Sequence, residues 1–295
     1  MLISGDIFSP LNRKARYINV NGKLLDLSTP KVTGILNITA DSFFRASRVT
    51  GEKEILRTAV RMTEDGADIL DVGGYSTRPG AIDIPVEEEL KRVAKAIKLI
   101  TRELPDAIIS VDTFRADVAR IAVNDCGAGI INDISGGEGD PGMFPLVEQL
   151  NVPYILMHMQ GTPRDMQDNP VYDDVVADVL RWFGPRIFRL QAAGVKDIII
   201  DPGFGFGKTK EHNFELLRRL DDFSIAGLPL MVGVSRKGMI WKTLGTNADE
   251  ALNGTSVLNT IALMSGADIL RVHDIKEAVQ AVKLYKSTYR QERVN

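Results

Sequence analysis

Eight short, mostly β-branched runs alternate with stretches of helical period along most of the chain. The runs cover residues 32–38, 68–74, 108–113, 129–134, 154–158, 197–201, 230–235 and 268–273. Because they are almost continuously apolar, each predicts a strand that is buried on both faces, as in a parallel sheet covered by helices. Eight β-then-α units within 295 residues favour a single (β/α)8 TIM barrel, and an open doubly wound sheet is the alternative.

The stretches between the runs carry helix signals. One apolar stripe is formed by Leu90, Val93, Ala94, Ile97 and Ile100. The acidic residues 87–89 beside that stripe predict a solvent-exposed helix face. Glycine precedes several runs, as expected for left-handed helix C-caps.

The segment before the first run predicts a β-hairpin. In "YINVNGKLLDL", Asn21 and Gly22 separate two strand-like halves, and Asn-Gly favours a tight hairpin turn. We expect this hairpin to close the N-terminal mouth of the barrel. The domain prediction is an N-terminal extension and hairpin over residues 1–31, packed on a barrel of residues 32–295, in a single domain overall.

Composition excludes several classes of partner. The net charge is −3, and no block of Lys and Arg occurs, which argues against a nucleic-acid groove or an anionic membrane surface. No stretch of about 18 apolar residues and no signal-peptide pattern is found, so we expect a cytoplasmic protein. The one cysteine, Cys126, is interpreted as inert packing rather than as a nucleophile.

Polar or ionisable side chains lie at or just after the end of each of the eight runs. They are Asn37, Thr77 with Arg78, Asp112, Asn132, His158, Asp201, Ser235 with Lys237, and Arg271 with His273. Barrel enzymes build their sites from loops at the C-terminal ends of the strands, so these groups are expected around one mouth. Any single one could instead cap a helix or be a satisfied core residue, but eight such positions favour a site.

The chemistry of these side chains predicts a site with two parts, one for a heterocycle and one for an anion. Asp112, Asn132 and Asp201 are suited to a flat heterocycle with N–H donors, and Lys237 to a ring carbonyl or nitrogen. Arg78, Arg271 and His273 are suited to a multiply charged phosphate. The stretch "DPGFGFGK" is neither a Walker A loop, because Pro202 stands at the required first glycine, nor a dinucleotide fingerprint. Its glycines predict a sharp backbone turn beside a ligand.

Eight segments resemble the signature motifs of the dihydropteroate synthase family, in order from about residue 17 to the end of the chain. They are "GILNITADSF" (34–43), "DVGGYSTRPGA" (71–81), "SVDT" (110–113), "NDISGG" (132–137), "MHMQGTPRDMQ" (157–167), "DPGFGFGK" (201–208), "SRKGM" (235–239) and "GADILRVHD" (266–274). No single segment is specific, but their combination is.

The resemblance implies condensation of 6-hydroxymethyl-7,8-dihydropterin pyrophosphate with p-aminobenzoate, with release of pyrophosphate, in folate synthesis. The implied pterin-binding residues are Asp112, Asn132, Asp201, Lys237 and Arg271, and the implied pyrophosphate-binding residues are Asn37, Arg271 and His273. The implied p-aminobenzoate-binding residues are Thr77, Arg78, Pro79, Phe206 and Ser235. The resemblance implies a catalytic role for Asp201, Lys237, Arg271 and His273, and we expect Asp41 and Phe43 to take part in closure of the first loop.

The resemblance also implies a Mg²⁺ cofactor held by Asn37 and a homodimer packed through late barrel helices. Lys208 is expected either to tether its loop or to contact the ligand. The chain departs from the family pattern at Ala40, at Tyr75, where glutamate is usual, and at "FRAS" (44–47). Two alternatives remain, a methyltetrahydrofolate-dependent methyltransferase and a catalytically silent pterin-binding paralogue.

Overall fold

The computed structural model describes residues 16–38, 48–76, 83–163 and 165–289. Its strands are β1 (Tyr17–Val20), β2 (Lys23–Asp26), β3 (Lys31–Asn37), β4 (Ile69–Gly73), β5 (Ile108–Asp112), β6 (Ile130–Asp133), β7 (Tyr154–Met157), β8 (Ile198–Asp201), β9 (Met231–Val232) and β10 (Ile269–Val272). Its α-helices are α1 (Arg48–Glu64), α2 (Val86–Glu103), α3 (Ala116–Ile121), α4 (Met143–Leu150), α5 (Val175–Ala192), α6 (Lys210–Arg218), α7 (Gly238–Leu244), α8 (Leu252–Met264) and α9 (Ile275–Tyr289). A π-helical turn, η2 (Ala122–Cys126), follows α3, and a 3₁₀ helix, η3 (Leu220–Ala226), follows α6.

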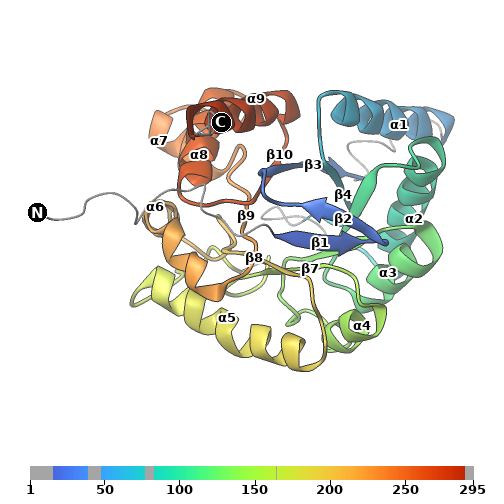
Figure 1. Ribbon diagram of the computed structural model, residues 1–295, viewed down its shortest axis with the longest axis horizontal. Helices are drawn as coiled ribbons and strands as arrows, with labels where there is room; N and C mark the ends of the chain where they lie inside the picture. Colours follow the sequence, from blue (N-terminus) through green and yellow to red (C-terminus); the bar gives the residue numbers. More distant parts are fainter. Residues whose placement is uncertain (1–15, 39–47, 77–82, 164, 290–295) are drawn as a thin grey trace, which may run out of the picture.

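The eight strands from β3 to β10 form one parallel sheet in the order β8-β7-β6-β5-β4-β3-β10-β9. A parallel bridge between Ile200 and Leu230 joins β8 to β9 and closes the sheet into a barrel. Figure 1 shows the helices as an outer ring around these strands. The predicted TIM barrel is therefore confirmed, and each of the eight predicted strands is found.

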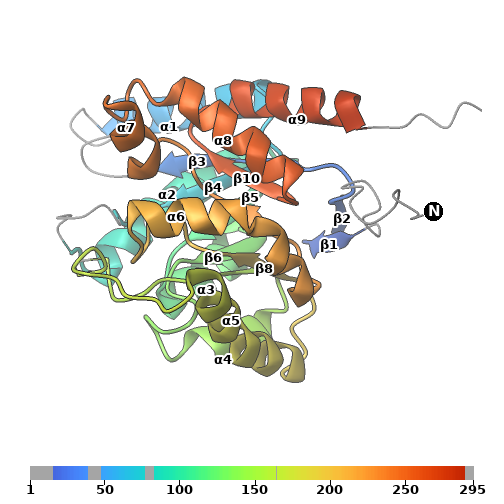
Figure 2. The ribbon, with the colours of Figure 1, turned by 90° about the vertical axis from the view of Figure 1, so that its left-hand side faces the viewer.

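The predicted hairpin is also present, as the antiparallel pair β1 and β2. Its turn residues Asn21 and Gly22 have φ values of 52° and 81°, the left-handed conformation that this tight turn requires. Ile18 and Val20 pack inside the barrel with the first inward residues of several strands, among them Ile69 and Ile199. Figure 2 shows the hairpin at one end of the barrel. It thus closes the N-terminal mouth, while the division of domains at residue 31 stays a prediction.

Side chains along each barrel strand point alternately outward, into the core beneath the helices, and inward, into the lining of the barrel. The outward residues, such as Val72 and Val111, pack under the helices. The inward residues begin with an apolar layer against the hairpin and continue with the buried polar residues Thr33, Asp71 and Ser110. The register then aligns Asn37 with Gly73, Gly73 with Asp112, and Asp112 with Asn132. The strand pattern therefore carries polar groups toward the C-terminal mouth.

Contrary to the prediction from the sequence, the acidic residues 87–89 are not all exposed to solvent. Glu87 is exposed, but Glu89 is fully buried with 0% exposure, so the prediction of a solvent-exposed acidic face was wrong for this residue. Glu89 is buried because its carboxylate has two partners, the Thr113 hydroxyl at 2.6 Å and the Arg115 guanidinium at 2.9 Å.

Two predictions drawn from composition can be compared with the described residues. Cys126 is buried, and burial raises the pKa of its thiol, as expected for a packing residue. Within the described segments, no helix is both long and apolar enough to cross a membrane.

Candidate active site

Arg271 lies at the centre of the polar lining, on β10. Its Nε donates to Asp71 Oδ2 at 2.7 Å, and its Nη2 donates to Asp112 Oδ2 at 2.6 Å. Burial opposes the charge of Arg271, but Asp71 and Asp112 raise its pKa above the ordinary value. Burial also raises the pKa of Asp112 to about 7, although Arg271 acts in the opposite direction. The guanidinium therefore bridges carboxylates from β4 and β5.

Asn132 extends this network from β6. Its amide nitrogen donates to Asp71 Oδ2 at 3.0 Å. The remaining oxygens, Asn132 Oδ1 and Asp71 Oδ1, are buried and have no hydrogen-bond partner in the structure. Because an unpaired buried acceptor is costly, these two atoms mark a place where an N–H donor of a ligand or a water would be stabilised.

Asp201 stands at the end of β8, at the start of the "DPGFGFGK" loop. It is buried, and its Oδ1 accepts a hydrogen bond from Gly203 N at 2.7 Å. Burial raises the pKa of Asp201, and the charge of Lys237 opposes that shift.

The glycines of the "DPGFGFGK" loop are required by its path. Gly203, Gly205 and Gly207 have φ values of 72°, 78° and 62°, a region that side chains with a Cβ rarely adopt. A Cβ at Gly203 would also stand only 1.8 Å from His158 O. The predicted sharp turn beside the mouth is therefore present.

Lys237 reaches the "DPGFGFGK" loop from the start of α7. Its Nζ donates to Phe204 O and lies 4.7 Å from the centre of the Phe206 ring. Burial lowers the pKa of Lys237 to about 8, and the nearby Asp201 carboxylate opposes the shift. An ammonium group, a carboxylate and an aromatic face are thus adjacent on this side of the mouth.

Ser235 and His273 form a pair between β9 and β10. Ser235 Oγ lies 3.0 Å from His273 Nδ1 and accepts a hydrogen bond from the His273 backbone N–H at 3.1 Å. Arg236, which lies between Ser235 and Lys237 in the sequence, has a φ of 56° and donates two hydrogen bonds of 2.7 and 2.9 Å to Asp274. This contact fixes the turn that carries Ser235 and Lys237.

Asn37 and Asp112 lie on either side of Gly73, and the lack of a side chain at Gly73 leaves a space between them. A Cβ at Gly73 would stand 3.4 Å from Asp112 Oδ2 and 3.5 Å from Asn37 Oδ1. Both oxygens therefore face the same small space on the inner side of β4.

Lys208, together with His158, holds the "DPGFGFGK" loop in place. Lys208 is buried, and its Nζ contacts His158 Nδ1 at 2.8 Å, Phe206 O at 3.0 Å and Gly203 O at 3.1 Å. Burial, reinforced by Lys208, lowers the pKa of His158 to about 2, so the neutral imidazole accepts the hydrogen bond. Of the two roles considered for Lys208, these contacts favour loop tethering.

The structure brings together the described members of the predicted site on the C-terminal side of the barrel. They are Asn37, Asp112, Asn132, Asp201, Phe206, Ser235, Lys237, Arg271 and His273. Five further predicted residues, Asp41, Phe43, Thr77, Arg78 and Pro79, lie outside the described residues, as do Ala40 and the segment 44–47. The ligand roles assigned to all of these residues stay predictions.

Asp71 is the residue of the network that sequence reasoning missed. It is fully buried and binds both Arg271 and Asn132. The signal was an acidic residue inside the apolar run "DILDVGG", two positions after Ile69 and two before Gly73. Period-two alternation places these three residues on one face of the strand, and that face lines the barrel.

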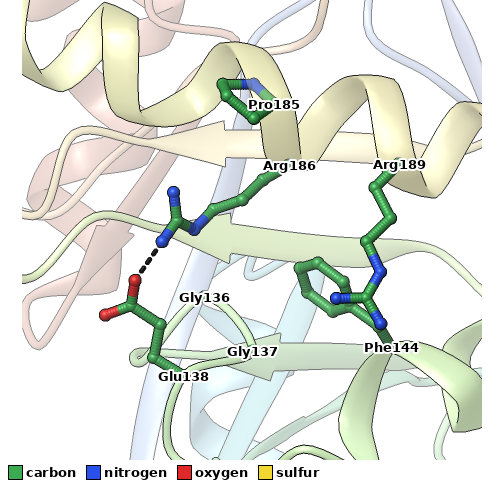
Figure 3. Close-up of a pocket in the computed structure, with 7 residues that line it drawn as sticks. All are labelled: Gly136, Gly137, Glu138, Phe144, Pro185, Arg186 and Arg189. Carbon is green, nitrogen blue, oxygen red and sulfur yellow. Dashed lines mark hydrogen bonds and ion pairs between the residues drawn. The ribbon is translucent and has the colours of Figure 1, made fainter.

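A separate pocket of about 250 Å³ lies on the outer side of the barrel, between the "NDISGG" turn and α5. Figure 3 shows Arg186 directed at Glu138 and Arg189 beside the Phe144 ring. Arg186 also donates to Trp182 O at 2.8 Å. These contacts hold α5 to the turn, and the groups of the predicted site are not among those that line this pocket.

Fold and geometry together define a barrel enzyme whose mouth offers carboxylates, an amide and cations to a polar heterocyclic ligand. The model of the family "Pterin binding enzyme" matches residues 33–273, and the chain belongs to this family. The sequence is 45% identical to the dihydropteroate synthase of Escherichia coli K12 over 269 residues, which cover 90% of this chain and 94% of that protein.

Solved structures agree with this assignment. The chain is similar to Xanthomonas albilineans dihydropteroate synthase with 4-aminobenzoic acid, at 40% identity and a TM-score of 0.86, over 93% of this chain and 98% of that one. A second structure from the same organism, in complex with 7,8-dihydropteroate, is 37% identical with a TM-score of 0.83, over 92% and 98% of the two chains. The resemblance to dihydropteroate synthases is therefore confirmed.

Proposed function

We propose that this enzyme condenses 6-hydroxymethyl-7,8-dihydropterin pyrophosphate with p-aminobenzoate to give 7,8-dihydropteroate and pyrophosphate. The observation that carries the proposal is the buried set of Asp71, Asp112, Asn132 and Arg271, with Asp201 and Lys237 nearby. A reduced pterin displays N–H donors and ring acceptors along one edge, and these side chains offer complementary groups.

The pterin is assigned to the inner part of the mouth. Asp201 accepts from the amide and amine N–H groups of the ring, while Asp112 and Asn132 accept from the remaining donors. The unpartnered Asn132 Oδ1 supports this assignment, because a ligand donor would satisfy it. Lys237 donates to a ring carbonyl or nitrogen, and Arg271 covers the ring while it remains paired with the carboxylates below.

The pyrophosphate is assigned to the rim formed by Asn37, Arg271 and His273. Asn37 Oδ1 is a hard oxygen donor, and Mg²⁺ takes few protein ligands while it retains water and phosphate oxygens. The residues therefore fit the expected ion, although the described residues contain no cluster of three or more His, Cys, Asp or Glu that could hold a metal. When bound, Mg²⁺ would neutralise charge on the diphosphate.

Electrostatic stabilisation and orientation account for the reaction. Arg271 and His273 stabilise charge that develops on the departing pyrophosphate, and the electron-rich dihydropterin delocalises positive charge on the carbon left behind, so we infer departure before attack. An aryl amine is neutral near pH 7 and needs orientation more than deprotonation. Holding it in line is worth several kcal/mol of the roughly 7–11 available to ideal intramolecular reactions.

The second substrate is assigned to Phe206, Ser235, Thr77, Arg78 and Pro79. The Phe206 ring supplies an aromatic wall, and Ser235 Oγ, held by His273, supplies a polar group for the carboxylate. The roles of Asp41 and Phe43 in covering this substrate belong to the same proposal.

The proposal extends to a homodimer formed through α8. Val257, Ile261 and Met264 are 50%, 39% and 49% exposed, and their spacing places them on one face of the helix. A continuous exposed apolar stripe of this kind favours a protein partner, and we infer a second copy of this chain. Sedimentation analysis of the wild type and of Ile261→Glu tests this, because the variant should be monomeric. A cytoplasmic location stays a prediction.

One assay separates the proposed function from its alternatives. The protein is incubated with dihydropterin pyrophosphate, p-aminobenzoate and Mg²⁺, and dihydropteroate is measured by chromatography. Formation of dihydropteroate is the expected result. Pterin binding without product would favour the silent paralogue, and transfer of a methyl group from methyltetrahydrofolate would favour the methyltransferase.

A further inference from the structure

Lys208 is a buried lysine whose hydrogen-bond donors are all taken by the protein. It is 2% exposed, and its Nζ lies 2.8 Å from His158 Nδ1, 3.0 Å from Phe206 O and 3.1 Å from Gly203 O. An ammonium group has three N–H donors, so each of these acceptors can take one of them. No donor is left for a substrate, and any effect of Lys208 on the reaction must therefore pass through the loop that it holds.

Two of the three acceptors belong to the turn that carries Phe206. The Phe206 backbone N–H donates to Gly203 O at 3.1 Å, and both Gly203 O and Phe206 O accept from Lys208 Nζ. The ammonium group therefore joins the first and last residues of the turn 203–206 and fixes the main chain at Phe206. The Phe206 ring is only partly buried and packs against the cluster that contains Met157 and Met159, so its position depends on where this turn is held.

The third acceptor, His158, connects Lys208 to the barrel. His158 directly follows β7 and is buried. Its ring lies edge to face with the Trp182 ring, with 5.0 Å between the two ring centres. Lys208 thus links the turn of Phe206 to a side chain that packing holds at the end of a barrel strand.

Asp201, which is assigned to the pterin, is held in a different way. It is the last residue of β8 and is aligned with Met157 of β7 in the parallel register. Its backbone oxygen accepts from His158 N at 3.0 Å. The sheet therefore sets the position of Asp201, whereas Phe206 lies beyond the strand, in the loop. Loss of Lys208 should displace Phe206 more than Asp201.

We propose that Lys208 is a positioning residue for the aryl amine substrate, which it affects by placing the Phe206 ring rather than by touching the substrate. This inference rests on the proposed function, in which Phe206 forms the aromatic wall for p-aminobenzoate. Lys237 also contacts this loop, through Phe204 O, but it is itself assigned to the pterin. Lys208 is the lysine that holds the loop from inside the protein, whether or not the pterin is bound.

Steady-state kinetics of Lys208→Met test the proposal, with circular dichroism to check that the variant is folded. The KM for p-aminobenzoate should rise roughly tenfold or more, because small misplacements of a reactant are costly. The KM for dihydropterin pyrophosphate should change by less than about twofold. Lys210→Met is the matched control, because the Lys210 side chain is 45% exposed and pairs with Glu211 at the surface. It should leave both KM values unchanged.

A double-mutant cycle with Phe206→Ala tests the route by which Lys208 acts. Phe206→Ala alone should raise the KM for p-aminobenzoate, because it removes the aromatic wall. Adding Lys208→Met to Phe206→Ala should then raise this KM by less than about twofold, since residues that act on one contact are not additive. If Lys208→Met had its full effect in the absence of the Phe206 ring, the inference would be overturned.

Variants of His158 cover the case in which Lys208→Met does not fold. His158→Leu leaves one ammonium donor without its acceptor and should raise the KM for p-aminobenzoate by a few-fold. His158→Asn offers a side-chain oxygen in place of Nδ1 and should raise it less. Equal changes in the two KM values, or an unchanged KM for p-aminobenzoate in Lys208→Met or, where that variant does not fold, in His158→Leu, would also overturn the inference. A wild-type protein that makes no dihydropteroate would instead overturn the proposed function.

Discussion

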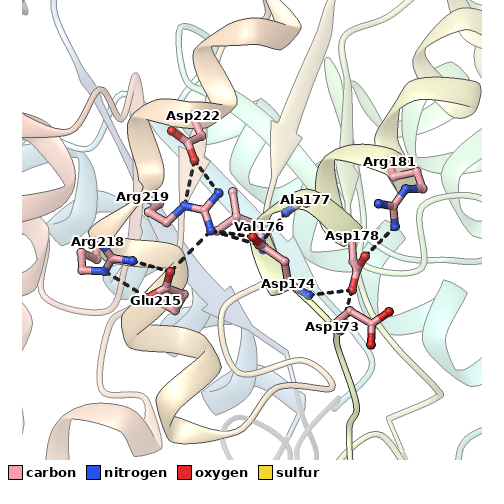
Figure 4. Close-up of polar contacts among 10 residues, drawn as sticks. All are labelled: Asp173, Asp174, Val176, Ala177, Asp178, Arg181, Glu215, Arg218, Arg219 and Asp222. Atoms are coloured by element: carbon pink, nitrogen blue, oxygen red, sulfur yellow. Dashed lines mark hydrogen bonds and ion pairs between the residues drawn. The ribbon is translucent and has the colours of Figure 1, made fainter.

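Two arginines of this protein each bind several carboxylates, one inside the barrel and one on its surface. Arg271 joins Asp71 and Asp112, whose side chains are 0% and 15% exposed. Arg219, at the end of α6, joins Asp174 and Asp222, whose side chains are 45% and 41% exposed. Figure 4 shows the surface network between α5, α6 and η3.

The difference lies in what each network does to the ionisation of its members. On the surface, hydrogen bonds from the Ala177 backbone and from Arg219 lower the pKa of Asp174, so its charge is stable and faces water. Inside the barrel, burial raises the pKa of Asp112 to about 7 against the effect of Arg271. Burial therefore disfavours the charge of the inner carboxyl, whereas the surface network connects helices through carboxylates that face water.

Replacing the two arginines gives the largest expected contrast. Arg271→Met leaves Asp71 and Asp112 buried without their cation, which should cost about 3–5 kcal/mol in the free energy of unfolding. Dihydropteroate formation should fall by about 10³-fold or more, because Arg271 is also assigned to the substrate. Urea unfolding and kcat/KM measure the two effects.

The matched control is Arg219→Met. Its partners remain hydrated, so exposed ion pairs of this kind contribute little, and kcat/KM should stay at the wild-type value. Similar losses of stability in the two variants would contradict the distinction between the networks.

The sequence predicted the barrel and most of the polar mouth because both depend on local patterns. Apolar runs such as 108–113 and 197–201 specify strands, and the residue that ends each strand, such as Asp112 or Asp201, is recognisable from its position alone. Gly203 was likewise interpretable, because a left-handed turn after a strand favours glycine.

The sequence did not predict Asp71 or the burial of Glu89, because both depend on partners that are distant along the chain. Asp71 binds Arg271, 200 positions away, and Glu89 binds Arg115, 26 positions away. No local period indicates which cation will neutralise a carboxylate. The register of the closed barrel was needed to bring these pairs together.

Asp201→Asn should have the next largest effect, a loss of roughly 10²-fold or more in catalytic efficiency. The amide removes the charge that pairs with two N–H donors of the pterin, while its size and its hydrogen bond from Gly203 can be retained. The measurement is kcat/KM for dihydropterin pyrophosphate, with Asp178→Asn in the surface network as control. A nearly unchanged value would remove Asp201 from its assigned role.

Activity should fall by about tenfold per pH unit above pH 8, because Lys237 has a pKa of about 8 and its charged form is the proposed donor. Stability should change in the opposite direction. The folded-state pKa lies below the ordinary value of 10.5, so the unfolded chain holds more protons between these values. The penalty for burying the charged form of Lys237 therefore diminishes as the pH rises through that window, and the folded state becomes more stable.

A pH profile of kcat/KM for the pterin substrate, combined with urea unfolding at each pH, separates the two trends. Lys237→Met should abolish the alkaline fall while it lowers activity at every pH. If activity and stability fell together above pH 8, the loss would reflect unfolding rather than titration of Lys237.

Asp174→Ala should have the smallest effect and should act on stability alone. Asp174 is the N-cap of α5 and accepts from Val176 N and Ala177 N, both at 3.0 Å, so its loss should cost about 1 kcal/mol in the free energy of unfolding. Asp174→Asn keeps an N-cap acceptor and removes only the charge that faces Arg219, so it should cost less. If Asn were as harmful as Ala, the ion pair rather than the cap would be the stabilising contact, and the surface network would resemble the inner one more than its exposure indicates.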